Sequence, residues 1–196
     1  MGTARNNKKK SEVGVMPDDR LSIYKEQYYF ELQRKDHLGK ELTLPVGVIT
    51  LLIGAESYFT GKIDSLHPSV PHAIYGVLLI LISLSIARAI YFLIRSNYGH
   101  IYEYFPTSRQ TENYYRQLET YCEENGKKSD IEPSFVKYLI DTYNKCNERN
   151  TMNNDKKSAY IHNARTAIIS AIIFSAMTVF ACNIETTEKV FHAILK

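Results

Sequence analysis

The sequence predicts an all-α integral membrane protein, because three apolar stretches interrupt a chain that is otherwise crowded with charged residues. These stretches are Leu42–Phe59, Ala73–Ile94 and Ala167–Ile184. A run of about 18 or more apolar residues forms a helix long enough to cross a hydrocarbon core of about 30 Å. The middle stretch contains a single charged residue, Arg88, and is difficult to explain in any other way. We therefore expect a transmembrane hairpin, a third membrane-spanning helix and a helical segment outside the membrane.

The distribution of Lys and Arg predicts how these helices are oriented. The connection between the first two stretches, Gly61–His72, has Lys62 as its single Lys or Arg residue. The segments before and after the hairpin are rich in these basic residues. Lys and Arg concentrate on the cytosolic side of membrane proteins. The N-terminus and the central segment should therefore be cytosolic, and the short connection should lie outside.

The N-terminal part should consist of a disordered basic arm over residues 1–16 and a cytosolic amphipathic helix over residues 17–40. Pro17-Asp18-Asp19 is a typical helix start, since acidic residues favour the positive end of a helix. Apolar residues then recur at the three- and four-residue spacing of one helical face. They are Leu21, Tyr24, Tyr28 and Leu32. The transmembrane hairpin follows over residues 41–96.

The central cytosolic segment, residues 97–163, is predicted to begin with a helix that starts at Thr107 and ends at Asn125-Gly126. Thr107 and Gln110 match the T-x-x-Q pattern of a capping box. Glycine is common just after a helix end, where the chain adopts a left-handed conformation.

A second helix of this segment should begin near Asp130, with Pro133 in its first turn, where proline is tolerated. The residues of its apolar face recur at helical spacing. They are Phe135, Tyr138, Leu139, Thr142, Tyr143 and Cys146. The Asn-rich run that follows contains neither Gly nor Pro, so we expect the helix to continue into the third span, residues 164–184. A short tail, residues 185–196, completes the chain.

Glu56 is the first candidate functional residue, because a carboxylate inside a membrane span is costly unless it faces water or a partner. If several copies met through the first span, Glu56 would form an acidic ring of the kind found in cation-selective pores. Thr50 and Gly54 belong to the small and polar residues that a wet lumen or close helix contacts require. The alternative is that the span ends near Ala55, which would leave Glu56 among the headgroups.

Aromatic and basic residues in the central segment form a second candidate site. Arg109, Tyr114 and Arg116 could bind a nucleotide or oligonucleotide, since nucleobases stack on aromatic rings and basic groups hold phosphates. The alternative is ordinary packing, because Tyr at helical spacing more often lies in a core than in a binding site.

No pattern in the sequence indicates an enzyme, a cofactor or a metal site. The catalytic motifs of hydrolases, nucleotide-binding loops and zinc proteases are missing. His67 and His72 are too few for a metal site without further ligands. The three cysteines are widely spaced and predict no disulfide framework.

The order of elements resembles the SLATT group, which consists of small two-transmembrane effectors of bacterial conflict systems. The resemblance lies in the helix Leu21–Leu38, the hairpin Leu42–Ile94 and the Tyr- and Asn-rich helix Phe135–Asn154 that leads into Lys156–Tyr160. It covers most of the chain as a pattern of elements. The third apolar stretch is additional to the two-span plan of the group.

The resemblance implies a homo-oligomer, such as a tetramer, that forms a pore or ion channel in the bacterial inner membrane and acts in anti-phage defence. It also implies control by a nucleotide signal and a partner protein that synthesises the nucleotide. Two alternatives remain open on the sequence: a non-conducting membrane adaptor that recruits a soluble partner, and a holin-like lysis protein. The helix Phe135–Cys146 would offer the adaptor an apolar face for a partner helix.

Overall fold

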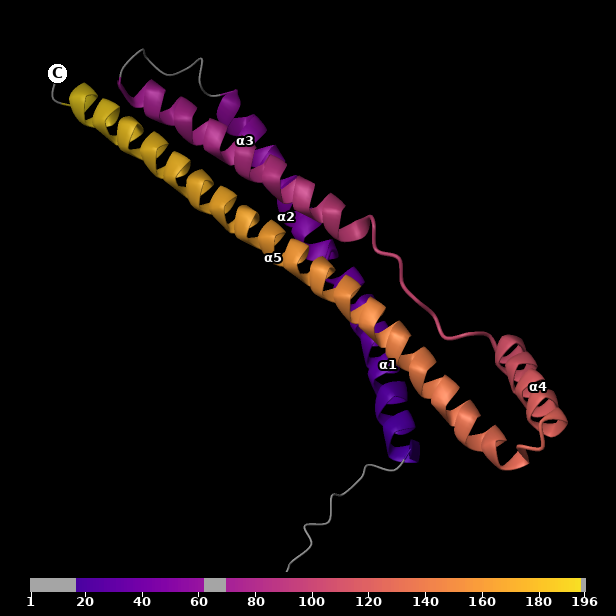
Figure 1. The fold of residues 1–196 in the computed structure, drawn as a ribbon. Helices are drawn as coiled ribbons and strands as arrows, with labels where there is room; N and C mark the ends of the chain where they lie inside the picture. Colours follow the sequence, from indigo (N-terminus) through magenta and orange to yellow (C-terminus); the bar gives the residue numbers. More distant parts are fainter. Residues whose placement is uncertain (1–16, 62–69, 195–196) are drawn as a thin grey trace, which may run out of the picture. The chain divides into compact units, whose positions relative to one another are not determined.

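The computed structural model describes residues 17–61 and 70–194, and side chains over residues 19–61 and 73–181. All regular structure in this part of the chain is helical (Figure 1). The helices are α1 (Pro17–Lys40), α2 (Thr43–Thr60), α3 (Val70–Asn97), α4 (Ser108–Glu124), the short 3₁₀ helix η2 (Lys128–Asp130) and α5 (Ile131–Ile194). The predicted basic arm over residues 1–16 and most of the connection between the first two spans lie outside the described residues.

The ends of α4 confirm the prediction from local sequence signals. The Thr107 side chain accepts a hydrogen bond from the backbone N–H of Gln110, and Gln110 Oε1 accepts one from the Thr107 N–H at 2.9 Å. This reciprocal pairing satisfies two N–H groups that the first helical turn leaves without partners. At the other end, Gly126 has a φ of 66°, a left-handed conformation that favours glycine.

The second predicted helix of the central segment and the third span form one continuous helix of 64 residues, α5. This confirms the continuation through the Asn-rich run. No Gly or Pro occurs after Pro133 in α5, so the backbone hydrogen-bond ladder has no built-in break. The helix continues to Ile194, and most of the predicted tail is therefore helical.

The chain divides into two compact units whose boundaries fall within α1, within the connection between α3 and α4, and within α5. Unit 1 combines the chain up to Glu31 with Glu103–Asn150, and unit 2 combines Leu32–Tyr102 with Thr151–Lys196. Both α1 and α5 contribute to each of the two units.

Unit 1 is held together by aromatic side chains that connect α1, α4 and α5. Tyr143 stacks on Phe105 with ring centroids 4.2 Å apart and contacts Tyr28 edge-on at 5.5 Å. Tyr114 of α4 stacks on Tyr138 of α5 at 3.9 Å. Aromatic pairs of this kind contribute about 0.5–1.5 kcal/mol each beyond their buried area. The predicted apolar faces of α1 and α5 are therefore the faces that pack inside unit 1.

Unit 2 has an aliphatic core formed by α2, α3 and the second half of α5, which run side by side in Figure 1. Ile49 of α2, Ile82 and Ala89 of α3 and Ala171 of α5 are buried in this core. Small residues on α5 allow close helix packing, as is common between membrane helices.

The outer faces of unit 2 carry large apolar side chains. Leu44, Leu51 and Phe180 are each more than 65% exposed. Three helical segments are long and apolar enough to cross a membrane by length and composition: Asp19–Thr60, Ala73–Asn97 and Lys128–Ala181. Extended apolar surfaces are costly in water, so this exterior indicates a membrane location.

Candidate functional site

The exposed face of α2 carries a row of small residues. Gly47, Thr50, Gly54 and Ser57 follow one another at spacings of three and four residues and are all exposed; we call them the small-residue stripe. No atom lies within 4 Å of the positions where a Cβ would stand on Gly47 and Gly54. The space in front of these glycines is therefore open enough for another helix to approach closely.

The hydroxyl groups of the stripe are partly satisfied within α2. Thr50 Oγ1 donates to the Val46 carbonyl at 3.0 Å, and Ser57 Oγ donates to the Ile53 carbonyl at 2.9 Å. Such bonds to the preceding turn lower the cost of placing a hydroxyl in an apolar medium. The oxygen atoms can still accept hydrogen bonds from water or from a neighbouring helix.

Glu56 lies on another face of α2. Ser83 Oγ of α3 donates a hydrogen bond to Glu56 Oε1, so the carboxylate belongs to the side of α2 that packs against α3. A helix turns by about 100° per residue, which places Glu56 about 200° around the helix from Gly54. The structure therefore brings Thr50 and Gly54 together and keeps Glu56 apart from them.

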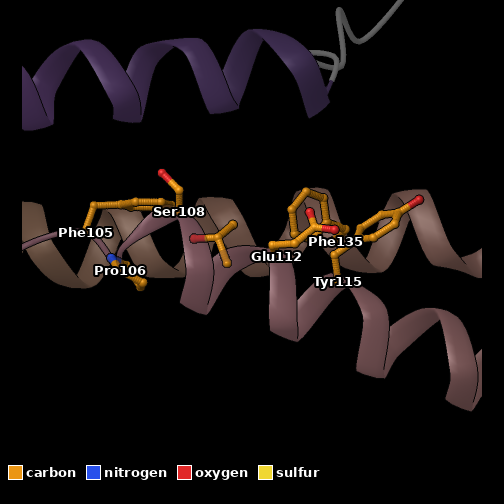
Figure 2. Close-up of a pocket in the computed structure, with 7 residues that line it drawn as sticks. Phe105, Pro106, Ser108, Glu112, Tyr115 and Phe135 are labelled. Carbon is orange, nitrogen blue, oxygen red and sulfur yellow. The ribbon is translucent and has the colours of Figure 1, made fainter.

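Unit 1 contains a pocket of 490 Å³ at the start of α4 (Figure 2). Phe105, Pro106 and Ser108 lie at one end, and Glu112, Tyr115 and Phe135 lie at the other. Thr111 completes the lining, and its hydroxyl is buried without a hydrogen-bond partner in the described part of the chain. The pocket thus combines aromatic surfaces with oxygen atoms that can accept hydrogen bonds.

The three predicted ligand-binding residues have different surroundings in unit 1. Tyr114 is stacked on Tyr138, so the structure places it in the packing between α4 and α5. Arg116 Nε donates to Glu112 Oε1 at 3.0 Å, beside the pocket. Arg109 is exposed one residue after Ser108 and lies on the same side of α4 as Glu112. Arg109 and Arg116 therefore flank the pocket, whereas Tyr114 does not line it.

Sequence reasoning missed the aromatic lining of this pocket. Phe105 lies in the connection before α4, and Phe135 lies on α5, so only the folded chain brings them together. Tyr115 contacts Phe135 edge-on at 5.0 Å and could have been noticed as the neighbour of Tyr114. The other lining side chains are the carboxylate of Glu112 and the hydroxyls of Ser108 and Thr111. They lie on the first turns of one helix, and this pattern is too weak to predict a site from the sequence.

Buried asparagines are a second feature that the folded chain reveals. In unit 1, Asn150 is fully buried, accepts from the Glu103 N–H and donates to the Glu103 carbonyl, each at 2.9 Å. Asn147 Nδ2 donates to the Tyr24 carbonyl at 2.9 Å. In unit 2, Asn154 accepts from the Tyr102 hydroxyl at 2.8 Å. Asn147 and Asn150 thus hold the backbone of α1 and of the connection between α3 and α4, and Asn154 holds the Tyr102 side chain of that connection.

Metal-binding or nucleophilic side chains could also form a site in the described part of the chain. Among them, no three His, Cys, Asp or Glu side chains are grouped closely enough to hold a metal ion. Burial raises the pKa of the Cys146 thiol, which keeps it protonated at neutral pH and makes it a poor nucleophile.

Comparison of the chain with protein-family models, with curated proteins and with solved structures found no match.

Proposed function

We propose that this chain is a membrane effector whose copies assemble through the small-residue stripe of α2 into a pore or ion channel in the bacterial inner membrane. The observation that carries the proposal is the open space in front of Gly47 and Gly54 on a helix long enough to cross a bilayer. Glycines of this kind let two helix backbones approach closely, and van der Waals contact is the main force between helices in lipid. The role in anti-phage defence rests on the resemblance to the SLATT group.

Leakage of a small dye from liposomes that contain the purified chain tests this function. A pore releases the dye, whereas a non-conducting adaptor leaves the vesicles intact at the same protein-to-lipid ratio. A chain that inserts into the vesicles but never releases the dye, with or without a ligand, would contradict the pore.

Copies that meet through the stripe would enclose a lumen along the edge of this contact, and Thr50 lies on that edge near the middle of α2. Thr50→Lys should therefore place a ring of positive charge in the lumen and lower the ratio of cation to anion permeability at least about tenfold. Glu56→Gln should change this ratio much less, since Glu56 faces Ser83 inside the hairpin. Reversal potentials measured across a planar bilayer under a salt gradient report both ratios.

The opposite result for the permeability ratios of these two variants would place the other face of α2 toward the lumen. If Glu56→Gln lowers cation preference and Thr50→Lys leaves it unchanged, Glu56 lines the pore as an acidic ring and the stripe does not. Insertion of each variant into the vesicles must match that of the unaltered chain, because a lysine in a membrane span is itself costly.

We further propose that a nucleotide or oligonucleotide bound at the unit 1 pocket controls the pore. A base could stack on the aromatic lining and donate its N–H groups to Glu112 and to the buried Thr111 hydroxyl. Arg109 would then hold the phosphates beside the start of α4, where backbone N–H groups also favour anions. A partner that synthesises the nucleotide would supply the signal.

Arg109→Gln should weaken nucleotide binding about tenfold, because hydrogen bonds to charged groups contribute about 1.5–3 kcal/mol each. Arg116→Gln should weaken it less, about threefold at most, since Arg116 already pairs with Glu112 in an exposed ion pair. Fluorescence anisotropy with labelled mononucleotides and short oligonucleotides measures both affinities. Equal affinities for the unaltered chain and Arg109→Gln would exclude Arg109 from the site.

A groove in unit 1 favours the membrane adaptor as a second candidate function. It has a volume of 510 Å³, an apolar floor that includes Val136 and Ile140, and charged residues such as Arg20 and Asp141 at its edges. The face that the sequence suggested for a partner helix is used inside the chain, because Tyr138 and Tyr143 pack against Tyr114 and Phe105. An adaptor would therefore bind its partner through this groove.

A further inference from the structure

The ends of α1 and α3 and the adjoining part of α5 form a strongly basic layer in unit 2. Outside the predicted spans, the described residues of unit 2 carry seven Lys and Arg side chains and only three carboxylates. The basic residues are Arg34, Lys35, Lys40, Arg95, Lys156, Lys157 and Arg165. We call this set the basic layer. It lies directly beside the ends of the apolar stretches that begin at Leu42, end at Ile94 and begin at Ala167.

The carboxylates of unit 2 neutralise only part of this charge. Asp155 is paired with Arg34 at 2.7 Å, and Glu41 is paired with Arg165 at 2.9 Å. Lys157 is half-buried, and its pKa is lowered first by burial and then by the neighbouring charge of Lys35. The layer therefore keeps a net positive charge that an anion from outside the chain can compensate.

A groove between α2 and α3 opens at the same end of unit 2. Its volume is 270 Å³, and its walls include the apolar side chains of Val46, Ile49, Ile90 and Leu93. Thr50 also lines the groove, with its hydroxyl bonded to the Val46 carbonyl. Its polar end is formed by Asn97 and Tyr98, which follow Arg95 at the end of α3. The groove is thus apolar along the predicted spans and polar at the depth of the basic layer.

We propose that this groove binds one acyl chain of an anionic phospholipid, whose phosphate lies at Asn97 and Tyr98 and is favoured by the basic layer. A phospholipid has the same division into an apolar chain and a charged head, and basic sites between membrane helices bind anionic headgroups. The occupant is a lipid because the groove walls lie within the two apolar stretches of the hairpin. The inference shares with the proposed function the insertion of unit 2 into a bilayer and the residue Thr50, which belongs to the small-residue stripe and also lines the groove.

Native mass spectrometry of the chain, extracted by mild detergent from nanodiscs of equal parts phosphatidylglycerol and phosphatidylcholine, measures the retained lipid. The unaltered chain should retain phosphatidylglycerol about tenfold more often than phosphatidylcholine. Ile90→Trp, which fills the groove, should remove most of the retained lipid. Leu84→Trp is the matched control, because Leu84 lies on α3 outside the groove and is 62% exposed. Equal retention by Ile90→Trp and the unaltered chain would overturn the groove as the site.

Charge variants test the second part of the inference and do not depend on a bulky side chain. Lys40→Gln and Lys156→Gln should each lower the preference for phosphatidylglycerol about fivefold, because one basic residue near an anionic surface contributes about that factor. Lys137→Gln and Lys145→Gln, which lie in unit 1, should leave it unchanged. No preference between the two lipids in the unaltered chain would overturn the anionic site.

Dye release from liposomes of the same lipid mixture separates this inference from the pore. Retained phosphatidylglycerol in a chain that never releases dye would support the lipid site and contradict the pore. Dye release by a chain that retains no phosphatidylglycerol would support the pore and contradict the lipid site. If Ile90→Trp instead lowers the number of copies per particle and retains lipid, a second copy of the chain occupies the groove and the inference is wrong.

Discussion

Gly54→Leu is expected to reduce dye release from liposomes at least about tenfold, while the chain still inserts into the vesicles. A leucine at this position fills the open space in front of the small-residue stripe and keeps two copies of α2 apart. Extra methylene groups in a close contact typically cost about 1–3 kcal/mol. Every copy in a closed assembly carries this cost, so the total free-energy cost of forming the assembly is larger than the cost at a single contact. Cross-linking in vesicles should show fewer oligomers in parallel with the loss of release.

Gly76→Leu provides the matched control for this substitution. Gly76 lies on α3, and no atom stands within 4 Å of the position of its Cβ, so a leucine is equally well accommodated within one chain. We expect dye release and cross-linking of this variant to remain within about twofold of the unaltered chain, as for ordinary surface substitutions. Equal loss in both variants would show that bulk anywhere in the hairpin is harmful, and the small-residue stripe would not be the contact.

Asn150→Ala should cause the largest loss of stability among the polar substitutions in unit 1. The Asn150 side chain pairs with both the N–H and the carbonyl of Glu103, in a connection that lacks regular structure. Removing one partner of a buried hydrogen bond costs about 1–3 kcal/mol for each group left unsatisfied. Two groups lose their partner, so the free energy of unfolding should fall by about 2–6 kcal/mol. In a chain of this size, the midpoint of thermal unfolding should fall by about 10 °C.

Circular dichroism of the detergent-solubilised chain during heating measures this effect. Asn144→Ala is the control, because Asn144 lies on the same helix but is exposed, and surface substitutions usually change stability by no more than about 0.5 kcal/mol. Asn150→Asp should be at least as harmful as Asn150→Ala, since it removes the donor to the Glu103 carbonyl and buries a charge. A midpoint for Asn150→Ala equal to that of Asn144→Ala would mean that the Glu103 connection contributes nothing to stability.

Several features of the fold could be predicted from the sequence because neighbouring residues decide them. The start of α4 depends on Thr107 and Gln110, which pair across one helical turn. The three long apolar helices follow from the bunching of apolar residues, and the continuity of α5 follows from the lack of Gly and Pro after Pro133. Each of these signals lies within a few turns of the element that it predicts.

The candidate sites depended on contacts between residues far apart in the chain. The sequence grouped Glu56 with Thr50 and Gly54, since all are small or polar residues in an apolar span. Only the packing of α3 against α2 determines that Glu56 faces Ser83 and that the small-residue stripe stays exposed.

The asparagine pairs and the unit 1 pocket also depend on contacts between residues far apart in the chain. Asn150 and Glu103 are 47 residues apart, so no local pattern could identify the partner of that side chain. The pocket likewise needs Phe135 of α5 to lie beside Tyr115 of α4. The sequence by itself thus determined which segments are helical and apolar, because backbone hydrogen bonding and hydrophobicity act locally. The tertiary structure decided which side chains share a site, because this depends on how each helix is rotated against its neighbours.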